Sequence, residues 1–417
     1  MTTTTSRPAH ATAWRNAVFA VFALNGLGAA TWAVRIPSIR DHLELPTSWV
    51  GYLILGVSVG SIIGLLLASH VIQWLGGRRT IAVMLGICSV ALVVIGLGAS
   101  TFGEFTLVVA GMALYGFGSA ICDVAMNVEG AAVEKAIGKT IMPLLHASWS
   151  AGMVIGTTLG TTLVFAHVDV AVHAIGMAVL LALGAVIAPR AIPRVATHAD
   201  TGEEVAHVSF RDRMSIWLEP RTLAIGLIAL GMAFTEGSAN DWLALGMVDD
   251  RGLENGQAAA LFTVFTAAMM VGRIVGGPLI DRFGRVPLLW ASGGSAAVGL
   301  ALVIFVPVIP VAVAGIVLWG LGASLGFPVA MSAAADDPAR AAARVSAVAT
   351  VGYCAFLVGP PLIGVVGEHV GILNALLIVF VLIVLATLAA PAARPPRAAR
   401  SAGAASGPAP SPSESMS

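Results

Sequence analysis

The sequence is poor in charge. Of its 417 residues only 11% are Asp, Glu, Lys or Arg, whereas 58% are apolar, and the mean hydropathy is +0.92. Soluble domains carry about 25% charged residues, so this composition excludes an ordinary soluble protein. The 22 basic and 22 acidic residues balance to zero net charge, which leaves no basic surplus to attract nucleic acid. We therefore expect an integral membrane protein with the lipid bilayer as partner and no nucleic-acid partner.

Cysteines and catalytic motifs are also scarce. Cys88, Cys122 and Cys354 lie far apart in apolar runs and form no CxxC pair, so neither a disulfide framework nor a metal site is indicated. No HExxH motif occurs, and two GxSxG matches fall inside apolar runs without the strand-turn-helix context of a hydrolase. An apparent P-loop has Val133 where its first Gly must stand. We expect no enzyme activity, no cofactor and no metal.

Long apolar runs dominate what is present. A helix that spans a bilayer needs about 20 mostly apolar residues, and the runs lack the period-two alternation of a membrane β-barrel. The sequence therefore predicts an all-α membrane protein with twelve transmembrane helices. Their expected ranges are 14–36, 48–71, 79–100, 104–128, 141–166, 170–189, 219–248, 257–280, 286–307, 309–333, 342–367 and 371–391.

Lysine and arginine predict the orientation. With both termini in the cytoplasm, 18 of the 22 basic residues fall on the cytoplasmic side, as the positive-inside rule requires. The other four are Arg35, Arg40, Arg251 and Arg273. We expect a multi-pass protein of the cell (plasma or inner) membrane. Its predicted segments are a disordered tail at 1–12, a six-helix half at 13–190, a cytoplasmic linker at 191–218, a second half at 219–392 and a disordered tail at 393–417.

The two predicted halves repeat one another. "IGLLLASHVIQWLGGR" (63–78) matches "VGRIVGGPLIDRFGRV" (271–286), and "LYGFGSAICD" (114–123) matches "LWGLGASLGF" (318–327). Both matches join corresponding helices of the two halves. Two similar six-helix halves in parallel orientation form one architecture of secondary transporters.

The segment "GGPLIDRFGR" (276–285) resembles the loop signature of the major facilitator superfamily. The residues that carry this resemblance are Gly277, Asp281, Arg282, Gly284 and Arg285. With the twelve predicted helices, the resemblance covers residues 14–391.

The resemblance implies a conformational latch. Asp281 would sit against the positive N-terminus of the helix that begins near Ile141 and would hold the cytoplasmic side shut. A simple topogenic turn is the alternative interpretation of the two arginines. In the first half, Gln73 stands where the aspartate would be, so only the second copy is intact.

Ionisable residues inside a membrane are costly, so they normally face a cavity or a partner. Glu236 lies about 22 Å along the helix from Arg221, within a hydrocarbon core of about 30 Å. Asn240 is its i+4 neighbour, and Gly237–Ala239 predict a weak, easily unwound helix of the kind that lines transporter sites. We expect Glu236 to face a central cavity; a structural ion pair is the alternative.

The first predicted helix has a matching segment. In the repeat Trp32 aligns with Trp242, and Asn25 falls near Glu236. Arg35 either pairs with Asp241 across the two halves or extends to the membrane surface, and Asp241 itself either serves the site or ends the helix in water. Arg273 we expect to be packed or paired.

The predicted helix 104–128 carries a second acid. Asp123 and Asn127 are four residues apart and share one helix face, and Phe327 stands at the Asp123 position of the other half. An acid present in one half alone favours chemistry over packing. His146 is either a proton relay for Asp123 or a structural histidine.

These residues predict a secondary transporter that moves a small molecule by alternating access. Protons are the expected coupling ion, because no ATP-binding motif is present and shielded carboxylates can titrate. The polar residues are similar to those of sugar porters such as the fucose permease group, so a polar solute such as a sugar is the first expectation. Drug or metabolite efflux by proton antiport and a transporter-like sensor are the alternatives. We expect a monomer.

Overall fold

The computed structural model describes residues 8–137, 141–193, 216–337 and 340–394. Within these ranges every regular element is a helix, which confirms the predicted all-α class. The first half comprises α1 (Pro8–Ala33), α2 (Ile36–His42), α3 (Thr47–Leu75), α4 (Gly77–Gly96), η1 (Leu97–Phe102), α5 (Phe105–Ile137), α6 (Met142–Phe165), α7 (Val170–Ile187) and η2 (Ala188–Ala191). The second half comprises α9 (Pro220–Ser238), η4 (Ala239–Leu243), α10 (Ala244–Asp249), α11 (Asn255–Phe283), α12 (Arg285–Phe305), α13 (Ile309–Ala323), α14 (Gly326–Ala334), α15 (Ala341–Val370), α16 (Ile372–Ala375), α17 (Leu377–Leu388) and η5 (Ala390–Ala393).

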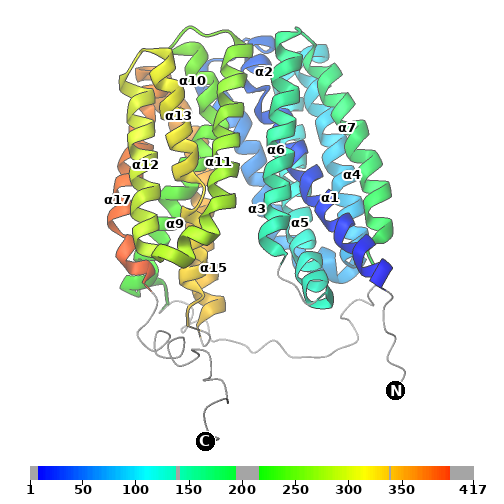
Figure 1. Cartoon of the computed structure of the whole chain (residues 1–417). Coiled ribbons are helices and arrows are strands. Elements are labelled where there is room, and N and C mark those ends of the chain that lie inside the picture. Colours follow the sequence, from blue (N-terminus) through cyan, green and yellow to red (C-terminus); the bar gives the residue numbers. More distant parts are fainter. Residues whose placement is uncertain (1–7, 138–140, 194–215, 338–339, 395–417) are drawn as a thin grey trace, which may run out of the picture.

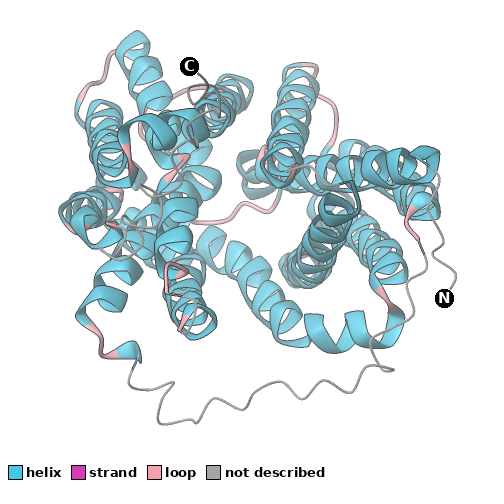
Figure 2. Cartoon of the chain, turned by 60° about the horizontal axis from the view of Figure 1, so that its bottom comes forward, coloured by secondary structure: helices cyan, strands magenta, loops and turns pink. Residues whose placement is uncertain are grey.

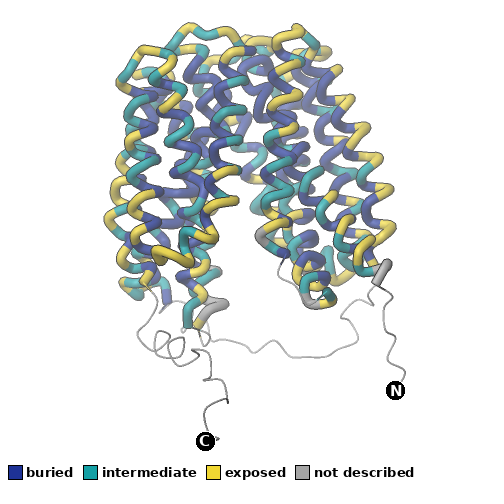
Figure 3. The backbone as a smooth tube through the Cα atoms, in the orientation of Figure 1, coloured by how far each residue is buried: buried dark blue, intermediate teal, exposed yellow. Residues whose placement is uncertain are grey.

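The described helices account for the twelve predicted crossings. Ten helical segments are long and apolar enough to span a membrane, and Ile372–Leu388 is a shorter apolar helix. The remaining crossing is α6, a helix of 24 residues that packs between α1 and α11. Large apolar side chains such as Leu66, Val179 and Val298 are exposed, and Figure 3 shows exposed residues along the outer surface of the helices. Such an apolar exterior is stable in lipid.

The helices form two bundles that stand side by side, with α1–α7 in one and α9–α17 in the other (Figure 1). Both bundles begin and end on the same side of the molecule, at the bottom of Figure 1. We call this side the terminal face; α1 and α9 begin there, and α7 and α17 end there. The other side, where α2 and α10 end, is the opposite face.

Close helix contacts recur at matching positions in the two halves. A Cβ atom on Gly116 of α5 would lie 2.1 Å from the carbonyl oxygen of Val57 on α3. A Cβ atom on Gly320 of α13 would lie 2.6 Å from the carbonyl oxygen of Phe265 on α11. Both glycines let two backbones approach where no side chain fits. These contacts confirm the internal repeat in three dimensions.

The turns after α3 and α11 also match. Gly76 has φ +74° and Gly284 has φ +81°, a conformation that favours glycine because other residues are strained there. Each turn sends the chain directly into the next helix at the terminal face. The repeat therefore extends from helix packing to backbone conformation.

The two halves contact each other mainly toward the opposite face. There α3 packs on α15 and α6 packs on α11. The hydrogen bonds and ion pairs that join the halves are Arg40–Asp249, Asp41–Asn255, Ser48–Glu368, Ser58–Phe356, Thr161–Thr263, Thr157–Thr266 and Ser150–Arg273. Among the described residues, no such bond lies nearer the terminal face than Ser150–Arg273. The bundles separate toward that face (Figures 2 and 3).

Candidate functional site

A cavity of about 330 Å³ lies between the two halves. Helices α1, α3, α5 and α6 line it from the first half, and α9, η4 and α15 line it from the second. Its polar lining consists of amides, hydroxyls and two carboxylates, contributed by Asn25, Ser58, Ser61, Ser119, Asp123, Asn240, Asp241 and Tyr353. Aromatic rings of Trp32, Trp149 and Phe356 add to an otherwise apolar wall.

Asp123 reaches this cavity from the middle of α5. Its side chain is exposed to the cavity. Asn127, one turn further along, donates its amide Nδ2 to the Asp123 carbonyl oxygen at 2.8 Å and to Oδ1 at 3.4 Å. The i, i+4 spacing thus places both side chains on one face, as the sequence predicts. Asn127 itself lies outside the cavity lining.

Asp241 reaches the same cavity from the second half. It lies in η4, a π-helical turn that follows Gly237 and Ser238, so the weak helix predicted here is distorted without being unwound. π-Turns inside helices often mark functional sites. Asp241 is only 9% exposed, and within the described part of the chain its carboxylate has no hydrogen-bond or ion-pair partner. The alternative of a solvated helix end is therefore wrong.

Of the asparagines and tryptophans predicted to line the site, some lie in the cavity and others in the core. Asn25 lines the cavity and accepts a hydrogen bond of 3.0 Å from Ser119 Oγ. Asn240 and Trp32 also line it, and the buried Asn240 Oδ1 and Trp32 Nε1 have no partner among the described residues. Trp242 is 1% exposed and lies outside the cavity. The two tryptophans align in the repeat, but only Trp32 is placed to contact a solute.

The prediction that Glu236 faces the cavity is wrong. Its carboxylate accepts two hydrogen bonds from Arg273 Nη2, at 2.9 and 3.1 Å, and it is absent from the cavity lining. Arg273 also donates to Ser150 Oγ at 3.2 Å and lies 5.7 Å from the ring centre of Trp149. The alternative weighed from the sequence, a structural ion pair, matches this arrangement. The pair belongs to the second half, and its arginine reaches α6 of the first.

Arg35 does not pair with Asp241. It is 3% exposed, and its Nε donates to Nδ1 of His173 on α7 at 3.1 Å.

His146 is no relay for Asp123 in this arrangement: its ring packs edge-on against Phe22, and it does not line the cavity. The reason is that α6 packs mainly on α1 and α11 and only slightly on α5, so the imidazole of His146 lies against α1.

Comparison with known proteins identifies the fold. The family model described as Major Facilitator Superfamily matches residues 139–353 and, in an overlapping match, residues 225–414. An uncharacterized transporter, y4wD of Sinorhizobium fredii, is 31% identical over 358 residues, which cover 86% of this chain and 92% of the relative. This chain belongs to the major facilitator superfamily. Membrane protein MosC of Rhizobium meliloti is 27% identical over 86% of this chain and 84% of its own length.

Solved structures of superfamily members share the fold. The nucleoside transporter NupG (D323A mutant) superposes with a TM-score of 0.72 at 14% identity, over 92% of this chain and 99% of its own. The transporter FucP in its outward conformation superposes with a TM-score of 0.64 at 16% identity, over 91% and 98%. This chain shares that fold of two six-helix halves, and its family model and relatives identify it as a major facilitator superfamily transporter.

The superfamily's loop motif is present, but its latch is not engaged. Asp281 and Arg282 are exposed, whereas the backbone amides of Ile141 and Met142 donate to Glu134 Oε2 at 2.7 and 2.8 Å. The predicted Asp281 contact is therefore replaced by a carboxylate of the first half. The halves separate toward the terminal face (Figures 2 and 3), which leaves the start of α6 to Glu134 of its own half.

The other motif residues serve the second half itself. Gly284 forms the turn into α12, and Gly277 has open space around it. Arg285 donates to Asp336 at 2.7 Å and to Ser332 at 2.8 Å. Arg282 lies over the ring of its neighbour Phe283. Arg285 is therefore the member of the motif with a clear partner.

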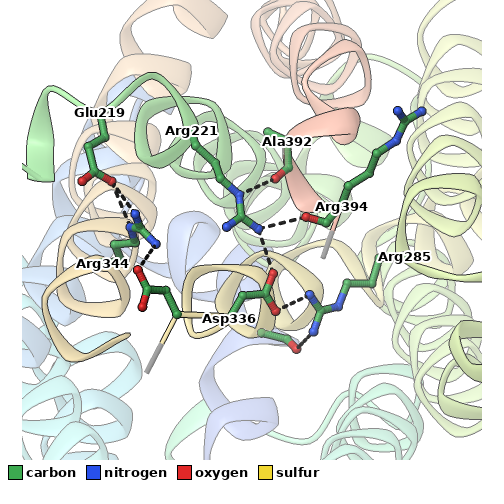
Figure 4. Close-up of polar contacts among 9 residues, drawn as sticks. Glu219, Arg221, Arg285, Asp336, Arg344, Ala392 and Arg394 are labelled. Carbon is green, nitrogen blue, oxygen red and sulfur yellow. Dashed lines mark hydrogen bonds and ion pairs between the residues drawn. The ribbon is translucent and has the colours of Figure 1, made fainter. Parts of the chain in front are cut away.

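A network of charged side chains lies at the terminal face of the second half (Figure 4). Asp336 lies between Arg285 and Arg221, which donates to it at 2.8 Å. Beside it, Glu219 accepts a hydrogen bond of 2.9 Å from Arg344 and another from Arg340. Partial burial acts to raise the pKa of Glu219, but its hydrogen bonds and the charge of Arg344 outweigh this and hold the pKa below its ordinary value.

Sequence reasoning missed several cavity residues. Tyr353 and Phe356 line the cavity from α15, and Ser58 and Ser61 line it from α3. Tyr353 is one of three tyrosines in the chain, and a phenol within an apolar run is a signal that marks such a site. The serines gave no signal, because serine is common in membrane helices and easily satisfied by backbone carbonyls.

Proposed function

We propose that this transporter moves a small polar solute across the membrane by alternating access and couples the movement to protons. The observation that carries the proposal is the pair of carboxylates, Asp123 and Asp241, that line one cavity from opposite halves. No lysine or arginine is among the described residues that line it. A carboxylate at this depth is costly when charged and unpaired, so proton uptake and release there is the simplest way to power transport.

Alternating access is supported by the asymmetry of the contacts between the halves. The ion pair of Arg40 with Asp249 and the bond of Asn255 to Asp41 join the halves at the opposite face, whereas the described residues of the terminal face provide no such bond. Such an arrangement represents one end state of a carrier whose halves rock about a central site. A cavity contained within one chain is sufficient for a monomer to work.

The proposed orientation places the terminal face in the cytoplasm of the cell that makes the protein. Arginines at helix ends on this face include Arg78, Arg221, Arg285 and Arg344, and the positive-inside rule favours that side for them. The structure then represents an inward-open carrier in the cell membrane.

The size and lining of the cavity favour a solute about as large as a sugar. A volume of about 330 Å³ is at the lower end of the range for small-molecule sites, about 300–1,000 Å³. Asn25 and Asn240 provide amide groups for hydroxyl groups of the solute. Among fold neighbours, NupG is named a nucleoside transporter and FucP a fucose:proton symporter, which supports a polar, proton-coupled solute here.

Reconstitution into proteoliposomes with a pH-sensitive dye inside tests the proposal. A transported solute should drive proton movement, and Asp123→Asn and Asp241→Asn should each slow it by at least about tenfold, equal to about 1.4 kcal/mol in the barrier. Glu104→Gln is the control, since Glu104 is exposed and lies outside the cavity. If both variants transport at the normal rate and stay pH-dependent, proton coupling by these residues is wrong.

A further inference from the structure

The charge balance of the cavity is one-sided. Asp123 and Asp241 line it, and no described Lys, Arg or His does. The arginines of this region do not enter the lining: Arg273 is paired with Glu236, and Arg35 donates to His173. A negatively charged solute would therefore meet repulsion from the charged carboxylates, with no basic side chain in the described lining to offset it.

The remaining wall of the cavity also suits a cation. The rings of Trp32, Trp149, Tyr353 and Phe356 line the same space as the two carboxylates. Aromatic faces attract ammonium groups, most strongly where water is displaced, and aromatic side chains around quaternary or protonated amines are a recurrent way of binding them. Carboxylates and aromatic rings together provide charge and a desolvated surface for one positive group.

Two unpaired hydrogen-bonding atoms in the lining set a second requirement for the solute. Asn240 Oδ1 and Trp32 Nε1 are buried polar atoms without partners among the described residues, and both residues line the cavity. One accepts and the other donates a hydrogen bond, and leaving either unpaired costs free energy. Hydroxyl groups can serve both, because a hydroxyl donates and accepts. The solute that fits therefore carries hydroxyl groups besides its positive charge.

We propose that the solute is a hydroxylated organic amine that binds as a cation, its single ammonium group taking the place of one proton on the pair Asp123 and Asp241. The inference rests on the proposed function and makes its substrate class specific. A cation and a proton neutralise the same carboxylates, so occupancy by one displaces the other. A neutral sugar displaces no proton, because it leaves the charge of the cavity unchanged.

This competition fixes the sign of a pH effect. Raising the pH removes protons from the two aspartates, so the affinity for a cation rises with pH. The affinity for a neutral solute that binds together with a proton falls instead. The titratable groups in the lining are Asp123 on α5, Asp241 on η4 and Tyr353 on α15; the described lining of α1, α3 and α6 holds none. His146 and the Glu236–Arg273 pair lie outside the lining.

A matched pair of probes tests the charge. Glucamine is a linear polyol with one primary amine, and sorbitol is the same chain with a hydroxyl in place of that amine. Binding to the full-length protein in detergent is measured by tryptophan fluorescence, since Trp32 and Trp149 line the cavity, from about pH 6 to about pH 8, where the amine stays protonated. We expect glucamine to bind at least about tenfold more tightly than sorbitol, with an affinity that rises with pH and with release of protons into a weakly buffered solution.

Variants assign the effect to the carboxylates. Asp123→Asn or Asp241→Asn should remove the preference for glucamine over sorbitol and flatten the pH dependence of glucamine binding. Asp123→Glu and Asp241→Glu keep the carboxylate and should retain a preference. Glu104→Gln should change neither the preference nor the pH dependence. Equal binding of sorbitol, an affinity that falls with pH, or no response to glucamine, ethanolamine and putrescine overturns the inference. If a neutral polyol then drives proton flux that depends on Asp123, the proposed function stands and the inference of a cationic solute is wrong. If no solute of either class drives proton flux, both fall.

Discussion

The two halves share their packing but not their polar groups. Gly116 and Gly320 bring neighbouring backbones into contact at equivalent places. Seven residues further along each helix, the halves diverge: Asp123 lines the cavity in the first half, and Phe327 occupies its position in the second. Residues that the repeat retains therefore support the bundle, and residues that break the repeat are the ones to examine for function.

The same contrast holds on α3 and α11, which carry the other matched segments of the repeat. Arg273 of α11 corresponds to Leu65 of α3, which lines the cavity as an apolar side chain. The second half thus holds a partly buried ion pair, and the first half has an apolar side chain at that position. Its arginine crosses to Ser150 and Trp149 of the first half, so the divergent residue also joins the two halves.

The largest effect is expected from breaking that ion pair. Arg273→Gln leaves the Glu236 carboxylate, whose side chain is 16% exposed, without its partner. Removing one member of a buried pair costs about 3–5 kcal/mol, and partial exposure reduces this to about 2–4 kcal/mol. Thermal unfolding in detergent should show the loss, and the double variant with Glu236→Gln should recover much of it.

Leu65→Gln is the matched control in the first half, because it places the same side chain at the equivalent position and removes no charge partner. It should destabilise the protein less than Arg273→Gln. If the double variant is as unstable as the single one, the lost packing of the arginine is responsible and the ion pair is not.

A smaller effect is expected from disturbing the shared packing. Gly116→Ala and Gly320→Ala each add a Cβ atom that meets a backbone carbonyl, at 2.1 and 2.6 Å. Overpacking costs about 1–3 kcal/mol, with the greater loss expected for Gly116. Unfolding temperatures of the purified variants measure the difference.

Gly86 and Gly294 provide the controls, since they also correspond in the repeat and a Cβ atom at either meets nothing within 4 Å. Alanine there should be neutral or stabilise the helix by up to about 1 kcal/mol. Equal losses at all four positions would mean that helix packing is not what these glycines serve.

The fold followed from local properties of the sequence. Run length and hydropathy predicted the twelve crossings, and the repeat predicted the two halves. Asp123 with Asn127 was predictable because the i, i+4 rule acts within one helix. Asp241 was predictable as a polar residue in an apolar run, although its burial was not, since that depends on the packing of η4.

Partners across helices were not predictable in the same way. Glu236 binds an arginine 37 residues away, and Arg35 binds a histidine 138 residues away. For each of these residues the sequence allowed more than one partner, and the actual partner depends on which helices are neighbours. The His146 relay failed for this reason, because α6 packs mainly on α1 and α11 and only slightly on α5.

The smallest effect is expected at the terminal face, where Glu219 ties α9 to Arg344 at the start of α15. Its pKa is lowered in the folded protein despite partial burial, because of Arg344 and Arg340. A carboxylate with a lowered folded pKa stabilises the protein above its unfolded pKa of about 4.3 and loses this contribution as the pH falls through the folded value. Since the pair is partly exposed to solvent, Glu219→Gln should cost less than about 1 kcal/mol near neutral pH.

The sign of the pH effect separates this ion pair from simple packing. The unfolding temperatures of wild type and Glu219→Gln should differ near pH 7 and converge as the pH falls below the lowered pKa of Glu219, whereas Glu104→Gln should show no comparable difference. A gap that persists in acid would assign the loss to the shape of the side chain. A difference in unfolding temperature that disappears in acid would assign the loss to charge. The second half then uses an ion pair to fix α9 to α15 at the terminal face. At the same face of the first half, the Glu134 carboxylate caps the backbone of α6.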